Sequence, residues 1–469
     1  MLLRLLQSLQ GCLSGPRLTY SAMALILLPS IVLAIIILSG NTYSTRRRLR
    51  NLQRLASTTN NMADQYDPKF SLRPGSTVDG LARIKAIYIH PIKSCGPIEV
   101  DRALLTKTGF MYDRCFALAA KTVNSKDAEA SKWRFISQRT KPLMSQIKTE
   151  LWLPHECSNS LDPLVRSGGC LVVKFNDPDV PSWVDRVETF ANTWDFSARP
   201  QVSFIVPLHL TAAQVKESQI EMKPFAISTR EAKGLDMGGM SSIATALPKL
   251  KRFLELPDNQ NLTLFKCTPD TLMRTERDLA PLEHIGSPAL HGYTDEQPVN
   301  INSLSSVHAV SALLPAENQP MNALRFRANI WITNAPAYDE ETWKRFRILP
   351  KGSGTKPRAE VAPTLSVVCR TSRCTMPNVD PETGKVDADK PLPGKKRGKP
   401  QPSTTLVQHR TVEMGNPAAL GFLGMHCVPE DRSIEEAEKE EVGLYVEVGD
   451  EIEVLERGVH LGGSTGDDY

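Results

Sequence analysis

The side chain in this sequence best suited to chemistry is Cys374, which lies in the segment VVCRTSRCTMPNVDPETGK. A hydrophobic run ends near Cys369, and Cys374 follows among turn-forming residues. Arg370 and Arg373 flank this thiol, and nearby cations lower the pKa of a cysteine and favour the thiolate, which binds metals or attacks electrophiles. We therefore predict that Cys374 is reactive. Cys369, in an apolar strand, is predicted to be a packed core thiol.

Two other segments carry cations that suit an anionic ligand. In IHPIKSCGPIEV, Lys93 and Ser94 follow a predicted strand, where a lysine, a hydroxyl and free backbone N–H groups of a turn can bind phosphate. The alternative for Lys93 is a surface lysine in a hairpin. In GFMYDRCFAL, Arg114 lies among apolar neighbours and should be partly buried, and a buried guanidinium needs a partner. That partner is either Asp113 or a bound phosphate.

Composition excludes several classes of protein. The chain has 469 residues, of which 41% are hydrophobic and 23% charged, as in folded proteins of two or three domains. The net charge of +4 comes from a local excess near the N-terminus, so we assign no nucleic-acid partner. Nine irregularly spaced cysteines favour free thiols in a reducing compartment, and none of the spacings completes a zinc ribbon. No nucleotide-binding or haem motif is visible, so the chain offers no evident site for nicotinamide, flavin or haem.

The N-terminal region contains an apolar run. Residues 20–40 read YSAMALILLPSIVLAIIILSG, about 21 uncharged residues, which is enough for one transmembrane helix. Five arginines between 46 and 54 follow it and only two precede it, so the bulk of the chain is predicted to face the cytosol. A cleaved signal peptide is the alternative, but such peptides have shorter apolar cores and the reverse charge order. The absence of acidic residues before Asp64 favours the mitochondrial outer membrane over the endoplasmic reticulum.

The rest of the chain is predicted to be of the α+β class, with strands dominating. Polar and apolar residues alternate, or apolar residues cluster, at 82–94, 116–122 and 170–175, and we expect these strands to share one antiparallel, barrel-like sheet. Further strands are predicted at 326–333, 364–371 and 443–456. Apolar residues spaced by three and four predict short helices at 183–194 and 306–315.

Four motifs in this order resemble the MOSC proteins, specifically their amidoxime-reducing branch: Ile-Lys-Ser-Cys at 92–95, Asp-Arg-Cys-Phe at 113–116, Phe-Arg-Ala-Asn-Ile at 326–330, and Ser-Arg-Cys with Val-Asp-Pro-Glu-Thr-Gly at 372–384. The resemblance spans residues 81 to about 456. It implies a MOSC N-terminal β-barrel domain at 81–205 and a MOSC β-barrel domain at 206–469, the latter with loop insertions at about 255–300 and 389–403. An N-terminal segment, 1–45, would carry the transmembrane helix, and 46–80 would be a polar tether.

The same resemblance implies a cofactor, Mo-molybdopterin, bound between the two domains. Cys374 would be the catalytic residue and the molybdenum ligand. The residues that would bind the cofactor are Lys93, Ser94, Arg114, Ser305, Arg327, Asn329, Ser372 and Arg373. The chain departs from the family pattern at Leu304, where a hydroxyl is usual, and at Ala328, where proline is usual.

The implied activity is that of a molybdenum-dependent oxidoreductase that reduces N-hydroxylated compounds such as amidoximes and hydroxylamines. Its implied partners are a membrane-bound cytochrome b5 and a flavin-containing cytochrome b5 reductase. MOSC domains also occur at the C-terminus of molybdenum-cofactor sulfurases. In such a sulfur carrier, Cys374 would be a nucleophile that holds a persulfide. The pyridoxal phosphate of such sulfurases, a family-level association only, belongs to a desulfurase domain for which there is no room before Leu81. A non-catalytic, membrane-tethered cofactor-binding protein is the third alternative.

Overall fold

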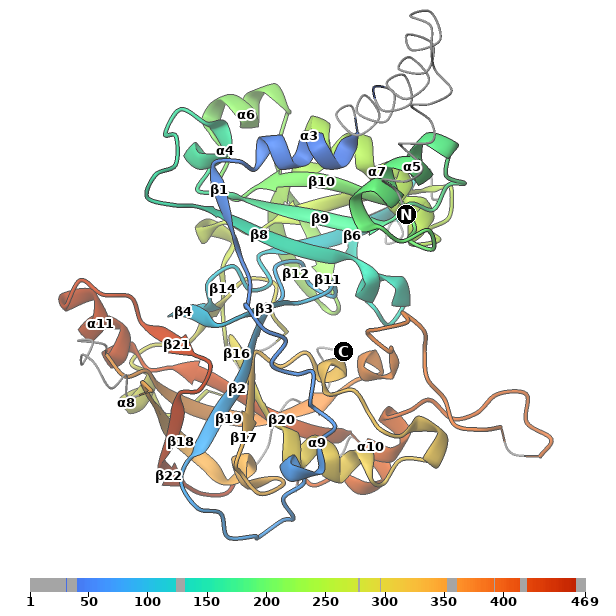
Figure 1. Ribbon diagram of the computed structural model, residues 1–469. Coiled ribbons are helices and arrows are strands. Elements are labelled where there is room, and N and C mark those ends of the chain that lie inside the picture. Colours follow the sequence, from blue (N-terminus) through green and yellow to red (C-terminus); the bar gives the residue numbers. More distant parts are fainter. Residues whose placement is uncertain are drawn as a thin grey trace, which may run out of the picture.

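The fold consists of two β-rich halves, one above the other in Figure 1. The computed structural model describes residues 31, 40–123, 131–276, 279–295, 297–351, 361–391, 393–413 and 420–460. The predicted transmembrane run, 20–40, lies outside these residues except at positions 31 and 40. Within the described ranges, no helix has both the length and the apolar character needed to span a membrane.

The upper half contains a four-stranded antiparallel sheet in the order β1-β8-β9-β10 and a closed barrel in the order β11-β12-β13-β6-β7. The strands are β1 (Leu52–Leu55), β6 (Phe116–Thr122), β7 (Arg134–Phe135), β8 (Lys148–Pro154), β9 (Cys170–Asn176), β10 (Gln201–Pro207), β11 (Met222–Ile227), β12 (Arg230–Asp236) and β13 (Gln260–Lys266). The helices of this half are α3 (Asn41–Arg48), α4 (Pro163–Arg166), α5 (Trp183–Thr193), α6 (Ala212–Glu217) and α7 (Ser241–Phe253).

The lower half is a sheet in the order β17-β16-β20-β19-β18-β22-β2-β3, and a pairing between β17 and β2 closes it into a barrel. Its strands are β2 (Ala82–Ile89), β3 (Ile98–Val100), β16 (Val299–Ser303), β17 (Ile330–Thr333), β18 (Trp343–Leu349), β19 (Thr364–Arg373), β20 (Gly421–Pro429) and β22 (Glu451–Arg457). Smaller strands are β4 (Arg102–Thr106), β5 (Gly109–Phe110), β14 (Met273–Arg274), β15 (Leu290–His291) and β21 (Tyr445–Glu447). The helices here are α8 (Leu282–Ile285), α9 (Leu304–Ser311), α10 (Ser403–His409) and α11 (Asp431–Lys439).

The centre of the lower barrel is β20, which is buried along its whole length. Met425 and Cys427 point into the main core, whereas Leu423 packs with residues of α9 on the other side. Because both faces of this strand are covered, its sequence GFLGMHCVP reads as a hydrophobic run without alternation. Alternation therefore did not predict it, and β8, β10, β12, β13 and β18 were not predicted either.

Most predicted elements are confirmed, and the dominance of strands in two barrels agrees with the predicted fold class. The predicted single sheet is wrong, because β2, β6 and β9 lie in three different sheets. The domain boundary at 205/206 also does not separate the sheets. Strands β11 to β13 pair with β6 and β7 of the upper half, and β2 and β3, from the start of the predicted first domain, complete the lower barrel. Alternation identifies a strand but not its partner, which long-range packing decides.

The prediction of a polar tether at 46–80 is wrong. Strand β1 pairs with β8, and Leu52 and Met62 are buried. The side chain of Gln65 accepts a hydrogen bond of 2.8 Å from the backbone N–H of Ala323. The segment thus runs from the upper sheet to the lower barrel and is bound to both. Its few apolar residues are too widely spaced for the sequence to predict this packing.

A buried acid in the lower barrel should make stability depend on pH. Glu340 is fully buried and accepts a hydrogen bond of 2.7 Å from Ser306 Oγ, and burial raises the pKa of Glu340 from about 4.5 to about 7. Because the pKa is higher in the folded state than in the unfolded chain, stability is lost as the pH rises through this interval. Glu340→Gln should therefore stabilise the protein at pH 8, by up to about 3 kcal/mol, and have little effect at pH 4. Thermal unfolding at both pH values measures this, with the exposed Glu438→Gln as control. An equal effect of Glu340→Gln at the two pH values would contradict it.

Candidate functional site

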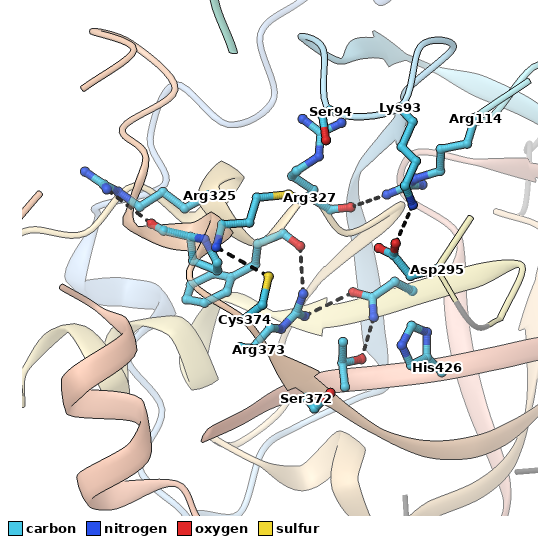
Figure 2. Close-up of a pocket in the computed structure, with 15 residues that line it drawn as sticks. Lys93, Ser94, Arg114, Asp295, Arg325, Arg327, Ser372, Arg373, Cys374 and His426 are labelled. Atoms are coloured by element: carbon cyan, nitrogen blue, oxygen red, sulfur yellow. Dashed lines mark hydrogen bonds and ion pairs between the residues drawn. The ribbon is translucent and has the colours of Figure 1, made fainter. Parts of the chain in front are cut away.

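Most of the side chains that the sequence singled out line one pocket between the two halves, shown in Figure 2. The pocket encloses about 650 Å³, part of it open to solvent. Its lining residues are Lys93, Ser94, Arg114, Asp295, Asn300, Arg325, Phe326, Arg327, Thr371, Ser372, Arg373, Cys374, Met376, Pro377 and His426. Among these lining residues, five are lysine or arginine and one is a carboxylate, so the pocket is strongly cationic.

Lys93 and Ser94 are positioned by the loop between β2 and β3, which reaches from the lower barrel to the upper half. The backbone N–H of Lys93 donates to Phe116 O of β6, and that of Gly96 donates to Ile147 O, each at 2.8 Å. These N–H groups are therefore not available to an anion, contrary to the prediction. The two side chains differ. Burial lowers the pKa of Lys93 to about 8, and its ammonium group pairs with Asp295. Ser94, in the left-handed region at φ 64°, has a buried Oγ with no partner among the described residues.

Arg114 has a protein partner. Its Nη1 lies 2.5 Å from Asp113 Oδ2 and 3.3 Å from Asn329 Oδ1, and its Nη2 donates to Arg327 O at 2.9 Å. Burial alone would raise the pKa of Asp113, but the adjacent Arg114 and the hydrogen bond from His90 lower it to about 2. Asn329 is buried behind Arg114, where its Nδ2 donates to Tyr88 O at 3.1 Å. It orients Arg114 and does not itself line the pocket.

Arg325 lies in η6 (Ala323–Phe326), and Arg327 directly follows it. Arg327 adopts φ 53°, which turns its side chain toward the β2–β3 loop, and its Nη1 donates to Cys95 O at 2.8 Å. Its Nη2 is buried and has no partner among the described residues. Burial, reinforced by Arg114, lowers the pKa of Arg327 to about 10. Arg325 is bound to Asp387 Oδ2 at 2.5 Å, at the opposite rim of the pocket.

Ser372, Arg373 and Cys374 lie where β19 ends, and Figure 2 shows Cys374 facing the pocket. The Cys374 Sγ accepts a hydrogen bond of 3.4 Å from the N–H of Met376. Arg373 donates instead to two backbone carbonyls, Leu423 O at 2.7 Å and Phe326 O at 2.9 Å. It fastens the end of β19 to β20 and to the η6 turn.

The predicted low pKa of Cys374 is wrong for the protein without ligand. Burial raises the pKa of the Cys374 thiol, and the N–H of Met376 and the cations nearby offset this only in part. Arg370 does not help, because its Nε donates to Glu341 Oε2 at 2.9 Å. Arg370 and Arg373 are close to Cys374 in the sequence, but the geometry of the strand directs both guanidinium groups to other acceptors. Cys369 is buried, as predicted.

The Val-Asp-Pro-Glu-Thr-Gly motif forms a tight turn beyond Cys374. Asp380 accepts hydrogen bonds from the N–H of Glu382 at 3.0 Å and from the hydroxyl of Thr383 at 2.8 Å. Gly384 has φ 67°, and a Cβ there would lie 2.9 Å from the side chain of Gln146 in the upper half. The motif therefore holds the Cys374 segment against the upper half.

Two predicted residues, Ser305 and Asn329, do not line the pocket, and several lining residues were missed. Ser305, in α9, donates to Phe70 O at 2.8 Å and does not line the pocket. The segment 255–300, expected as a loop insertion, contains β13, β14, α8, β15 and the start of β16 and brings Asp295 to the pocket. Asp295 pairs with Lys93; burial alone would raise the pKa of Asp295, but Lys93 and Arg114 lower it. His426, hidden in the apolar strand β20, has a pKa lowered to about 3, mainly by burial and by Arg373, and is neutral.

The eight cysteines that the structure describes are all free thiols. Within the described part of the chain, no three His, Cys, Asp or Glu side chains are grouped so as to hold a metal ion.

Fold and pocket together define a protein of two joined β-barrels with a cationic, thiol-bearing pocket at their junction. Comparison with protein families agrees: the MOSC N-terminal beta barrel domain matches residues 81–173, and the MOSC domain matches residues 288–453. The chain belongs to the MOSC domain-containing proteins, a family associated with binding of the molybdenum cofactor. No curated protein matches the chain significantly.

Proposed function

We propose that this protein binds Mo-molybdopterin in the pocket and reduces N-hydroxylated compounds, with electrons supplied by cytochrome b5 and its flavin-containing reductase. The observation that carries the proposal is the gathering of Lys93, Arg114 and Arg327 on the side of the pocket opposite the thiol of Cys374. Cations in this number suit a phosphate-bearing ligand, and a thiol suits a soft metal.

The donors left over in the pocket fit such a ligand. Ser94 Oγ and Arg327 Nη2 are buried polar groups without a partner among the described residues, and unpaired buried donors cost free energy unless a ligand satisfies them. Lys93, Arg114 and Arg327 would hold the phosphate. The ion pair between Lys93 and Asp295 would then be exchanged for one between Lys93 and the phosphate. Ser372 and Arg373 would support the rest of the ligand beside Cys374.

Cys374 would supply one protein ligand to molybdenum. A cysteine binds a metal as the thiolate, so the Cys374 thiol would lose its proton when the metal enters, and its raised pKa without ligand means that the metal must provide the driving force. When bound, the cofactor supplies the redox chemistry. In the overall reaction, an amidoxime takes up two electrons and two protons, its N–O bond breaks, and an amidine and water leave.

The experiment that tests the activity uses the full chain produced in a host that makes molybdopterin. A small aromatic amidoxime, cytochrome b5, its reductase and NADH are added, and amidine is measured together with NADH consumed. We expect about one amidine for each NADH, with no product when cytochrome b5 is omitted. A protein that carries molybdenum but forms no amidine and no amine from a hydroxylamine would contradict the proposed activity.

The anchor remains part of the proposal. The run at 20–40 would hold the chain in the mitochondrial outer membrane, with its bulk in the cytosol, and this would place the pocket close to membrane-bound electron donors.

A further inference from the structure

Helix α5 carries an apolar surface whose aromatic side chains are largely exposed. Trp183, Val187, Phe190 and Trp194 follow one another at spacings of four, three and four, the pattern of a helix face that is normally buried. Nevertheless, no residue of α5 is buried, and the exposed fraction is 67% for Trp183 and 81% for Trp194.

The apolar surface continues on both sides of the helix. Val180 before it is 90% exposed, and Phe196 after it is 87% exposed and stacks on Phe190, with ring centroids 3.9 Å apart. We call Val180, Trp183, Phe190, Trp194 and Phe196 the α5 aromatic patch. Large aromatic groups at this exposure are costly in water, so the patch indicates a partner.

The position of the patch indicates which partner. The apolar run 20–40 ends beside α5, because the N–H of Thr42 donates to Glu188 Oε1 of α5 at 3.2 Å. Helix α3 then continues with Arg46, Arg47 and Arg48, all exposed. In Figure 1, α3 and α5 lie on the outer surface of the upper half, away from the junction of the two halves.

We propose that the α5 aromatic patch and the arginines of α3 rest on the surface of the membrane that holds the N-terminal run. Tryptophan side chains concentrate at the level of the lipid headgroups, where the ring is in contact with hydrocarbon and the N–H with water. The arginines bind anionic headgroups at the same level. A single tether allows the folded part to rotate freely, whereas a tether with a second contact fixes its orientation. The inference depends on the predicted anchor but not on the proposed reaction.

The test is tryptophan fluorescence of the full chain, reconstituted into vesicles of phosphatidylcholine and phosphatidylserine that contain brominated lipid, which quenches by contact. Vesicles are isolated by flotation. Wild type is compared with Trp183→Phe/Trp194→Phe and, as control, with Trp133→Phe, which removes a tryptophan that packs on Phe265 in the barrel of the upper half. We expect the first variant to lose more than about half of the quenching, and the control to retain it.

Equal quenching in the wild type and in the α5 variant would overturn the proposal, and so would a chain that does not float with the vesicles. Absence of quenching in floated wild type would also overturn it: the patch would then be covered by the N-terminal run of its own chain or by a second copy. Cross-linking distinguishes those two cases.

Discussion

Replacing Cys374 by serine is expected to reduce amidoxime turnover at least about 100-fold, because losing a group that merely supports a metal ligand already costs 10- to 100-fold. Serine keeps the size of the side chain but does not offer the soft ligand that molybdenum prefers. Since Cys374 lines the pocket and is partly exposed, the fold should tolerate the change, and the unfolding temperature should be unaltered.

The matched control for this variant is Cys157→Ser, which removes an exposed thiol outside the pocket. It should retain full activity. A Cys374→Ser protein with wild-type turnover would show that the thiol is neither ligand nor nucleophile, and the site would then have to be sought elsewhere.

Arg114→Ala is expected to lower the free energy of unfolding by about 3 to 5 kcal/mol, the usual cost of removing one partner from a buried ion pair. The Asp113 carboxylate is buried, and its pKa of about 2 keeps it charged at neutral pH, so it would be left without its guanidinium. The variant should also lose the cofactor, because one of the phosphate-binding cations is gone.

A double variant separates the two effects. Arg114→Ala/Asp113→Asn removes the uncompensated charge, so most of the stability should return, while pterin retention should stay low. Urea unfolding measures the first quantity and fluorescence of released, oxidised pterin the second. If pterin retention returned together with stability, Arg114 would be only a structural residue.

The sequence was informative where the signal is local. The bounds of β6 agree with the predicted strand at 116–122, because alternation and flanking turns depend only on neighbouring residues. The family resemblance also implied that Lys93, Arg114, Arg327 and Cys374 share one site, and all four line one pocket. No local pattern could have predicted this.

What the sequence could not predict depends on partners far along the chain. Asp295 lines the pocket from the segment between β15 and β16, which reads as a loop in the sequence. His426 lies within a hydrophobic run whose burial is set by elements on both sides. For Cys374, the flanking arginines suggested a thiolate, but their hydrogen bonds are made to Glu341 and to backbone carbonyls.

The sulfur-carrier alternative depends on the same thiol but requires it to react as a nucleophile. A persulfide carrier attacks its donor as the thiolate, and the raised pKa of Cys374 disfavours that form at neutral pH. A metal ligand needs no free thiolate, since the metal displaces the proton. The raised pKa of Cys374 therefore favours ligation over sulfur transfer.

The most direct test of the central claim is the molybdenum and pterin content of the full chain, purified from a host that makes molybdopterin and compared with Cys374→Ser. The account predicts about one molybdenum and one pterin per wild-type chain, with molybdenum lost from the variant. A well-folded wild-type protein that contains neither molybdenum nor pterin would contradict it.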